Sequence, residues 1–194
     1  LLHNLRITWR TRLQTEIDPD DWAELLKLLD RGTREVRLKF CIFKILHNWY
    51  WTPQKLRGAG MLQHAKCWRC SNNNCDLIHI LCDCPMIQHY WTGIGRIMHK
   101  TTPIEVQPPK TLILLHDMDA YPDITRPQRR LLHTALATAK ICILRHWRSP
   151  TPSLEEWHVA MVQAATHERV IYNLQDQTDI FLKVWEPFLR AIEP

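Results

Sequence analysis

The sequence predicts an all-α protein with a small cysteine-rich segment inserted between its helices, and three observations support this class. Apolar residues recur at helical spacing almost throughout the chain. They make up 45% of the 194 residues, which is enough to bury a core. Prolines and polar residues separate the periodic segments, where they end one helix and begin the next.

The N-terminal part of the chain predicts two helices and a short third one. Asp18 caps the first helix, Pro19 takes its first position and Gly32 ends it. Its apolar stripe consists of Trp22, Leu25, Leu26 and Leu29. A second helix is expected over residues 33–50, and a new short turn or helix begins at Thr52-Pro53.

The helix over residues 33–50 has two apolar faces. One face carries Val36, Phe40, Phe43 and His47, and the other carries Leu38, Cys41, Ile42 and Ile45. A helix that is apolar on two faces is typical of a buried one, so we expect burial over much of its surface.

The C-terminal part of the chain predicts further helices. Pro85 opens a helix whose stripe is Ile87, Tyr90, Trp91, Ile94, Ile97 and Met98. Residues 101–110 contain three prolines and form a linker, and residues 111–115 fit either a short strand or a buried turn. A long helix over residues 128–147 has the stripe Leu132, Ala135, Leu136, Ala139, Cys142 and Ile143.

Polar and proline residues then mark the last two helices. Residues 149–152 break the long helix, and Ser153 with Glu156 forms a capping box. The helix after this box carries Trp157, Ala160, Met161 and Ala164 on one stripe, and the last helix carries Phe181, Val184, Trp185, Phe188 and Leu189. We expect residues 1–100, including a zinc knuckle at 67–85, and a helical region at 111–194 to form one compact unit.

The cysteine-rich segment has the spacing C-x2-C-x8-H-x4-C, formed by Cys67, Cys70, His79 and Cys84. Three thiolates and one imidazole are a ligand set for Zn2+, and a closed set of four is structural. The polar residues 71–74 between the two halves favour a turn. A redox role for the C-x2-C pair is disfavoured because no βαβ pattern surrounds it.

Two further thiols leave the ligand choice open. Cys75 is an alternative to His79, and Cys82 is an alternative to Cys84. The first choice remains the Cys67, Cys70, His79 and Cys84 set, which defines a CCHC-type knuckle.

The N-terminal sequence and the length of the apolar runs indicate in which cellular compartment the protein is expected. Leu1 in place of Met predicts a piece of a longer chain. We expect neither a signal peptide, because no long apolar run follows Leu1, nor a membrane span. A reducing compartment is the resulting expectation, and there clustered cysteines are more typical of metal sites than of disulfides.

Positive charge is concentrated in two blocks. Residues 31–70 contain nine Lys or Arg and the single acid Glu35, and residues 125–150 contain six basic residues and no acid. Such blocks suit a polyanion partner, and a solvated helix face is the alternative. The residues expected to contact nucleic acid are Lys55, Arg57, Lys66, Trp68 and Arg69.

Tryptophans divide into candidates for stacking on bases and candidates for the core. Trp68 in the knuckle is the favoured stacking residue, with packing over the metal site or the next helix as the alternative. At least one of Trp49 and Trp51 is expected in the core.

Motifs for catalysis are not found in the sequence, so we expect no enzyme. Polymerase chemistry needs clustered carboxylates that hold Mg2+, and the pair Asp20-Asp21 is better explained as capping a helix. The sequence has neither a phosphate-binding glycine loop nor a G-x-S-x-G motif.

The ordered landmarks resemble the reverse-transcriptase zinc-binding region of LINE-type, non-LTR retrotransposons. These landmarks are the stretch 43–56 (FKILHNWYWTPQKL), Cys67-Trp68-Arg69-Cys70, His79, Cys84-Pro85, Trp91, the stretch 145–150 (RHWRSP), the stretch 154–157 (LEEW), Tyr172, Phe181, Trp185 and Pro187. The likeness covers nearly the whole chain. Cys82 stands where the family often has an aromatic residue, and Cys75 is an extra thiol.

The resemblance implies a region that follows the reverse transcriptase and engages its RNA template or the target DNA. It further implies an intracellular ribonucleoprotein, in nucleus or cytoplasm, with the reverse-transcriptase domain of the same polyprotein as a partner. Two alternatives stay open at this point: a zinc-stapled helical module that binds another protein, and a non-functional remnant of a decayed element.

Overall fold

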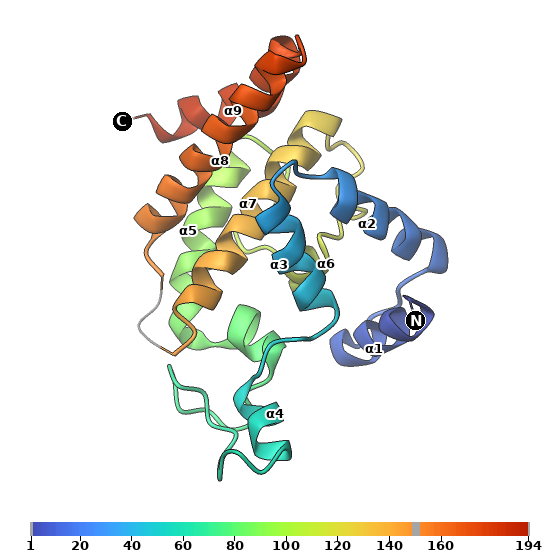
Figure 1. Cartoon of the computed structure of the whole chain (residues 1–194), viewed down its shortest axis with the longest axis vertical. Helices are drawn as coiled ribbons and strands as arrows, with labels where there is room; N and C mark the ends of the chain where they lie inside the picture. Colours follow the sequence, from blue (N-terminus) through green and yellow to red (C-terminus); the bar gives the residue numbers. More distant parts are fainter. Residues whose placement is uncertain (1, 149–151, 194) are drawn as a thin grey trace.

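The protein, seen here in a computed structural model that describes residues 2–148 and 152–193, is built from helices (Figure 1). The regular structure in these two ranges is entirely helical, which confirms the all-α class. In chain order the elements are α1 (Leu2–Leu13), α2 (Pro19–Arg31), α3 (Val36–Leu46), α4 (Pro53–Gly58), the π-helical turn η1 (His79–Asp83), the 3-10 turn η2 (Pro85–Ile87), α5 (Gln88–His99), α6 (Lys110–Leu115), α7 (Arg126–Arg145), α8 (Leu154–Leu174) and α9 (Thr178–Ile192).

Helix α7 is the central element of the fold. It begins at a capping box in which Thr125 and Gln128 satisfy each other's backbone N–H groups, and every residue from 131 to 140 is buried. A helix that is covered all round is a core helix. Helices α3, α8 and α9 and the turn η1 pack against it, as Figure 1 shows for the helices.

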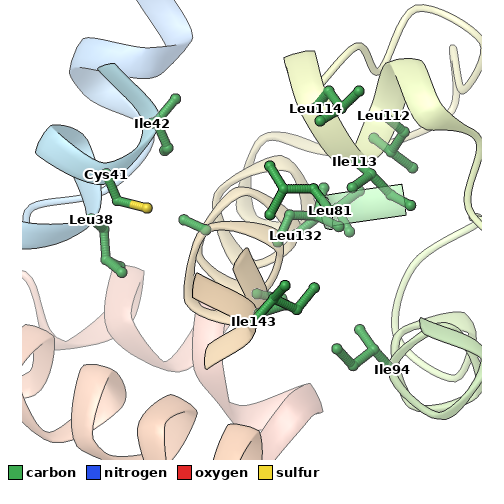
Figure 2. Close-up of a cluster of buried hydrophobic side chains, with 14 of the residues drawn as sticks. Leu38, Cys41, Ile42, Leu81, Ile94, Leu112, Ile113, Leu114, Leu132 and Ile143 are labelled. Atoms are coloured by element: carbon green, nitrogen blue, oxygen red, sulfur yellow. The ribbon is translucent and has the colours of Figure 1, made fainter. Parts of the chain in front are cut away.

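The core joins elements that are distant in the sequence. Figure 2 shows Leu132 and Ile143 of α7 among side chains from α3, α5, α6 and η1, with Ile42, Ile94, Ile113 and Leu81 among those labelled. A single cluster of buried apolar residues extends from Trp9 near the N-terminus to Phe188 in α9.

Capping residues place several helix starts where the sequence predicts them. Asp18 Oδ1 accepts a hydrogen bond from the Asp20 N–H (2.7 Å) as α2 begins at Pro19. Ser153 Oγ accepts one from the Glu156 N–H (3.0 Å) at the start of α8. The side chain of Leu29, which belongs to the predicted α2 stripe, lies outside the described part of the structure. Residues 149–151 of the predicted helix break also lie outside the described residues.

Three expectations about the helices were wrong or incomplete. Helix α1 was not predicted, and residues 111–115 form the helix α6 rather than a strand or turn. Helix α3 spans fewer residues than 33–50, and only one of its faces is buried: Val36, Phe40 and Phe43 are exposed. In the described ranges, no helix combines the length and apolar character that crossing a membrane requires.

Candidate metal centre

The four side chains of the predicted ligand set lie together at one point. The sulfur atoms of Cys67, Cys70 and Cys84 and a ring nitrogen of His79 all lie within 4.8 Å of one another. The Sγ atoms of Cys67 and Cys84 are 3.9 Å apart, and Cys70 Sγ is 3.3 Å from His79 Nε2. Three sulfurs and one nitrogen therefore point at a common centre.

The first two cysteines are positioned by a tight turn of the backbone. The Cys67 N–H donates to the Asn72 carbonyl (2.8 Å), and the Ser71 N–H donates back to the Cys67 carbonyl (2.9 Å). Ser71 adopts positive φ, which lets the chain reverse. Burial acts to raise the pKa of Cys67, but hydrogen bonds from the Cys70 and Arg69 backbone N–H groups and from His79 outweigh it and lower this pKa to about 6. The turn thus favours a thiolate.

The second two ligands are brought together by the π-helical turn η1. The Cys84 N–H donates to the His79 carbonyl (2.9 Å), which closes a turn of five residues. In a π-helix residues i and i+5 lie above one another, so the x4 spacing places both side chains on one side. Asp76 Oδ1 accepts from the His79 N–H (2.8 Å) and fixes the start of this turn.

The size of the cluster fits a tetrahedral zinc ion. Zn–S bonds of about 2.3 Å at the tetrahedral angle place two sulfurs about 3.8 Å apart, and the Cys67–Cys84 separation of 3.9 Å agrees. Cys67, His79 and Cys84 are buried, and Cys70 is half-buried. Burial and the neighbouring Cys67 sulfur raise the pKa of Cys84 to about 12, so the sulfurs need a cation to ionise together.

The two alternative thiols lie outside the four-atom cluster. Cys75 is buried and close to Cys67, and burial together with that neighbouring sulfur raises its pKa. Cys82 is buried on η1, and burial also raises its pKa. Neither belongs to a group of ligand atoms that converges in the described residues.

The knuckle is fastened to the helical body by polar contacts that the sequence did not reveal. Asp76 Oδ2 pairs with the Arg12 guanidinium of α1 (2.7 Å), and the Trp91 indole of α5 donates to the Leu81 carbonyl (2.8 Å). Arg69 donates to the carbonyls of Ile80 (3.0 Å), Ile143 (2.9 Å) and His146 (3.3 Å).

These contacts change how the residues expected to bind nucleic acid are understood. Arg69 is committed to three carbonyls, two of them at the C-terminal end of α7, where a cation is favoured. Its role is therefore structural. Lys66 and Arg57 are exposed, as phosphate contact requires, and Lys55 is half-buried.

The expected stacking tryptophan is partly covered, whereas two others are exposed. The Trp68 ring lies 5.4 Å from the Trp147 ring, and the Arg148 guanidinium covers it at 5.0 Å. The expectation that Trp49 or Trp51 lies in the core was wrong, because each is 55% exposed. The segment between α3 and α4 turns both indoles outward, and periodicity does not report the direction of a side chain in a turn.

A second polar cluster, of Lys140, His116 and His133, is buried in the core and was missed in the sequence. Lys140 Nζ donates to the Ile113 carbonyl (2.7 Å) and lies 2.5 Å from His116 Nε2. His116 Nδ1 is 2.7 Å from His133 Nδ1. The three side chains thus form one buried series of hydrogen bonds.

Burial dominates the electrostatics of this second cluster. It lowers the pKa of Lys140 to about 7 and that of His133 to about 3. Lys140 lies in the basic block 125–150, yet it is completely buried and is unavailable to a polyanion. Lys140 lies four residues after Leu136 and three before Ile143 of the predicted apolar stripe, and this spacing was the sequence signal for an inward position.

The chain was also compared with models of known protein families, and no family model matches it.

Proposed function

We propose that this chain is a zinc-binding, nucleic-acid-binding module of the kind that follows the reverse transcriptase in LINE-type retrotransposons. The observation that carries the proposal is the convergence of three sulfurs and one imidazole nitrogen within 4.8 Å. Four protein ligands leave no open position for a substrate or a reactive water, so the ion is a structural one.

Zinc acts in this proposal as the clamp of the knuckle. Cys67 and Cys70 hold the ion from one side of the turn, and His79 and Cys84 hold it from η1. The ion joins the polar loop that carries Cys67 and Cys70 to the turn η1. The loop has little core of its own, whereas Ile80 and Leu81 of η1 are buried against the helices. Metal binding then supplies folding free energy to this part of the chain.

Exposed positive charge near the knuckle supports RNA or DNA as the partner. Lys66 adjoins the first ligand, Arg57 lies in the last turn of α4, and Arg148 follows α7; all three are exposed. Arg145, the last residue of α7, is exposed as well and lies 3.9 Å from Glu156. Phosphate contacts need accessible cations such as these. Within a polyprotein, the module would act inside the cell beside the reverse-transcriptase domain.

The salt dependence of oligonucleotide binding tests the proposal. The zinc-loaded chain is titrated into labelled single-stranded RNA and DNA between 50 and 300 mM KCl. We expect the logarithm of the association constant to fall linearly with the logarithm of salt, with a slope of about −0.7 for each phosphate contacted. Lys66→Gln with Arg57→Gln should flatten that slope, whereas Lys183→Gln on α9 should leave it unchanged.

Two results would count against nucleic acid as the partner. One is the absence of binding to any of the oligonucleotides at the lowest salt concentration. The other is an affinity that stays constant across the salt range, because phosphate contacts release counterions. The same metal centre would then be better explained as the structural zinc site of a helical module that binds another protein.

A further inference from the structure

Helix α3 presents aromatic rings to solvent on the face opposite to its buried one. Phe40 is 52% exposed and Phe43 is 43% exposed, and Trp49 in the following turn is 55% exposed. Leu38, Ile42 and Ile45 cover the core from the other face. Solvent-facing helix positions normally carry polar residues, so an exposed aromatic group on this scale marks an interaction surface.

We call this group of rings the α3 ledge and define it as Phe40, Phe43, His47 and Trp49. The Phe43 and His47 ring centroids are 4.2 Å apart, and those of Phe43 and Trp49 are 5.3 Å apart in an edge-to-face arrangement. The His47 and Trp49 rings are 5.6 Å apart. These three rings support one another, and Phe40 lies three residues before Phe43 on the same exposed face of the helix.

Positive charge accompanies the ledge. The Lys44 ammonium lies 4.3 Å from the centre of the Phe40 ring, and Arg37 is exposed on the same helix. The single acid of this block, Glu35, is already paired with Arg37 (2.8 Å). The ledge therefore combines apolar rings with the Lys44 cation, and the Glu35–Arg37 pair beside it adds no net charge.

A polar cavity adjoins the ledge at the turn between α3 and α4. It has a volume of about 410 Å3, and Arg12, Asn48, Gln54, Lys55 and Asp76 are among the residues that line it. Asn48 lies between His47 and Trp49 in the chain, and its carbonyl accepts a hydrogen bond from Lys55 Nζ. Burial, and then the nearby Arg12, lower the pKa of Lys55. Asp76 in the same lining pairs with Arg12 (2.7 Å), so the positive charge left for a bound anion is that of Lys55.

We propose that the α3 ledge stacks the bases of an unpaired RNA or DNA strand while the adjoining Arg12–Lys55 cavity receives a backbone phosphate. This inference rests on the proposed function and names where and in which form the nucleic acid is bound. Single-strand binding surfaces combine aromatic rings, on which successive bases stack, with cations along the backbone. A duplex offers no free base faces to the ledge.

The chemistry of the ledge favours a strand of nucleotides over a polypeptide helix. A partner helix is bound by laying its apolar face into a hydrophobic groove. Phe40, Phe43 and Trp49 instead project from a single helix and its turn, with Lys44 over one ring and a cavity lined by Arg12, Lys55 and other polar residues beside them. The positive charge of residues 31–70 complements phosphates.

The ledge is tested with the full zinc-loaded chain and three fluorescently labelled probes: a U12 strand, a dT12 strand and a 12-base-pair DNA duplex. The double variant Phe43→Ala/Trp49→Ala should bind both strands at least about tenfold more weakly than the wild type, since each stacking residue typically contributes a 5- to 150-fold factor. Trp49→Leu retains apolar area and removes the indole, and should weaken binding by roughly fivefold.

Matched controls separate stacking from loss of apolar surface and from unfolding. Val170→Ala/Leu174→Ala removes exposed apolar area from α8 and should leave both affinities unchanged. Gln54→Asp places a negative charge in the cavity without removing a cation, and should weaken strand binding most at low salt. Zinc content and melting temperature should match the wild type in every variant used.

The outcomes separate two claims: that the chain binds nucleic acid, and that the α3 ledge is where it binds. If the wild type binds strands and the ledge variants bind equally well, the ledge inference is overturned and the nucleic-acid proposal stands. If the wild type prefers the duplex, the ledge is not the binding surface. If no oligonucleotide binds, but the chain forms a dimer that Phe43→Ala/Trp49→Ala dissociates, the ledge is a protein-docking face and both proposals fail.

Discussion

Six of the seven cysteines lie in or near the knuckle or α3, but their surroundings assign them different roles. Cys67, Cys70 and Cys84 point at His79, with the closest contact between Cys70 Sγ and His79 Nε2 at 3.3 Å. Cys75 is buried near Cys67, but its sulfur is not among the four ligand atoms that converge. We therefore expect Cys75 to act as a small packing residue.

Single substitutions of these cysteines should separate ligands from neighbours. We expect Cys84→Ser to lower the zinc affinity at least about tenfold, because one thiolate of four is lost. Cys75→Ser should retain one zinc per chain with a modest loss of stability. Zinc content after dialysis against a weak chelator, measured by atomic emission, checks both. Retention of zinc by Cys84→Ser together with its loss from Cys75→Ser would reverse the ligand assignment.

The buried histidine pair makes stability depend on pH. Burial lowers the pKa of His133 from its ordinary value of 6.5 to about 3, so between these values the unfolded chain binds the proton that the folded chain excludes. The free energy of unfolding should therefore fall as the pH falls through this window, by about 1–2 kcal/mol between pH 6.5 and pH 5 from this residue alone.

The variant His133→Gln isolates this effect from protonation of the metal ligands. Its side-chain amide can hydrogen-bond to His116 Nδ1 as donor or acceptor, but it has no proton to gain in this pH range. Denaturant unfolding at several pH values should show a shallower decline for the variant than for the wild type. Equal slopes for the two proteins would mean that His133 is charged or solvated in the fold.

The roles of some residues could be predicted from the sequence, and those of others could not. The convergence of Cys67, Cys70, His79 and Cys84 was predictable, because a zinc site requires specific atoms and their spacing indicates that they can meet. The burial of Lys140 was not predictable, because a lysine in a basic block is expected in water, and its partners at Ile113 and His116 lie more than twenty residues away. Only tertiary structure brings such partners together.

Helices with a strong apolar stripe and a capping residue were the predictable elements. Helix α9 follows its pattern closely, with Phe181, Val184, Trp185 and Phe188 all buried. Helix α1 has no such stripe and is attached through Trp9, whose indole donates to the Leu46 carbonyl (2.9 Å). Helix α6 is six residues long and its last four residues are all apolar, so its sequence carries no period that distinguishes helix from strand.

Helix α5 depends on a close approach that only glycine permits. A Cβ atom at Gly95 would lie 1.9 Å from the Val106 carbonyl oxygen in the linker 101–110, whereas one at Gly93 would meet the flexible Leu154 side chain at 3.1 Å. The linker is thus packed directly on the helix.

The two glycines should respond in opposite ways to substitution by alanine. Gly95→Ala should destabilise the protein by about 1–3 kcal/mol or more, because backbone must move. Gly93→Ala should be close to neutral, since gained helix propensity of about 1 kcal/mol offsets the contact with Leu154. Urea unfolding of both variants and the wild type provides the comparison, and equal stabilities for the two variants would contradict the close packing of the linker on α5.

On the scale of the whole molecule, the knuckle connects helices α1 and α7, which are distant in the sequence. Asp76 binds Arg12 of α1, and Arg69 binds carbonyls at the end of α7. The knuckle and α4 project from one end of the helical body, with α8 and α9 toward the other (Figure 1). A zinc ion at this position would fix the arrangement of α1, α4 and α7 around the exposed cations and the α3 ledge.

The claim on which this account depends is that Cys67, Cys70, His79 and Cys84 bind one zinc ion together, and X-ray absorption at the zinc edge tests it most directly. The purified wild-type chain should contain one zinc with three sulfur neighbours at about 2.3 Å and one nitrogen neighbour at about 2.0–2.1 Å. A shell of four sulfurs, or one dominated by oxygen and nitrogen, would contradict this ligand set, and a chain that purifies without zinc and does not take it up would contradict the metal centre itself.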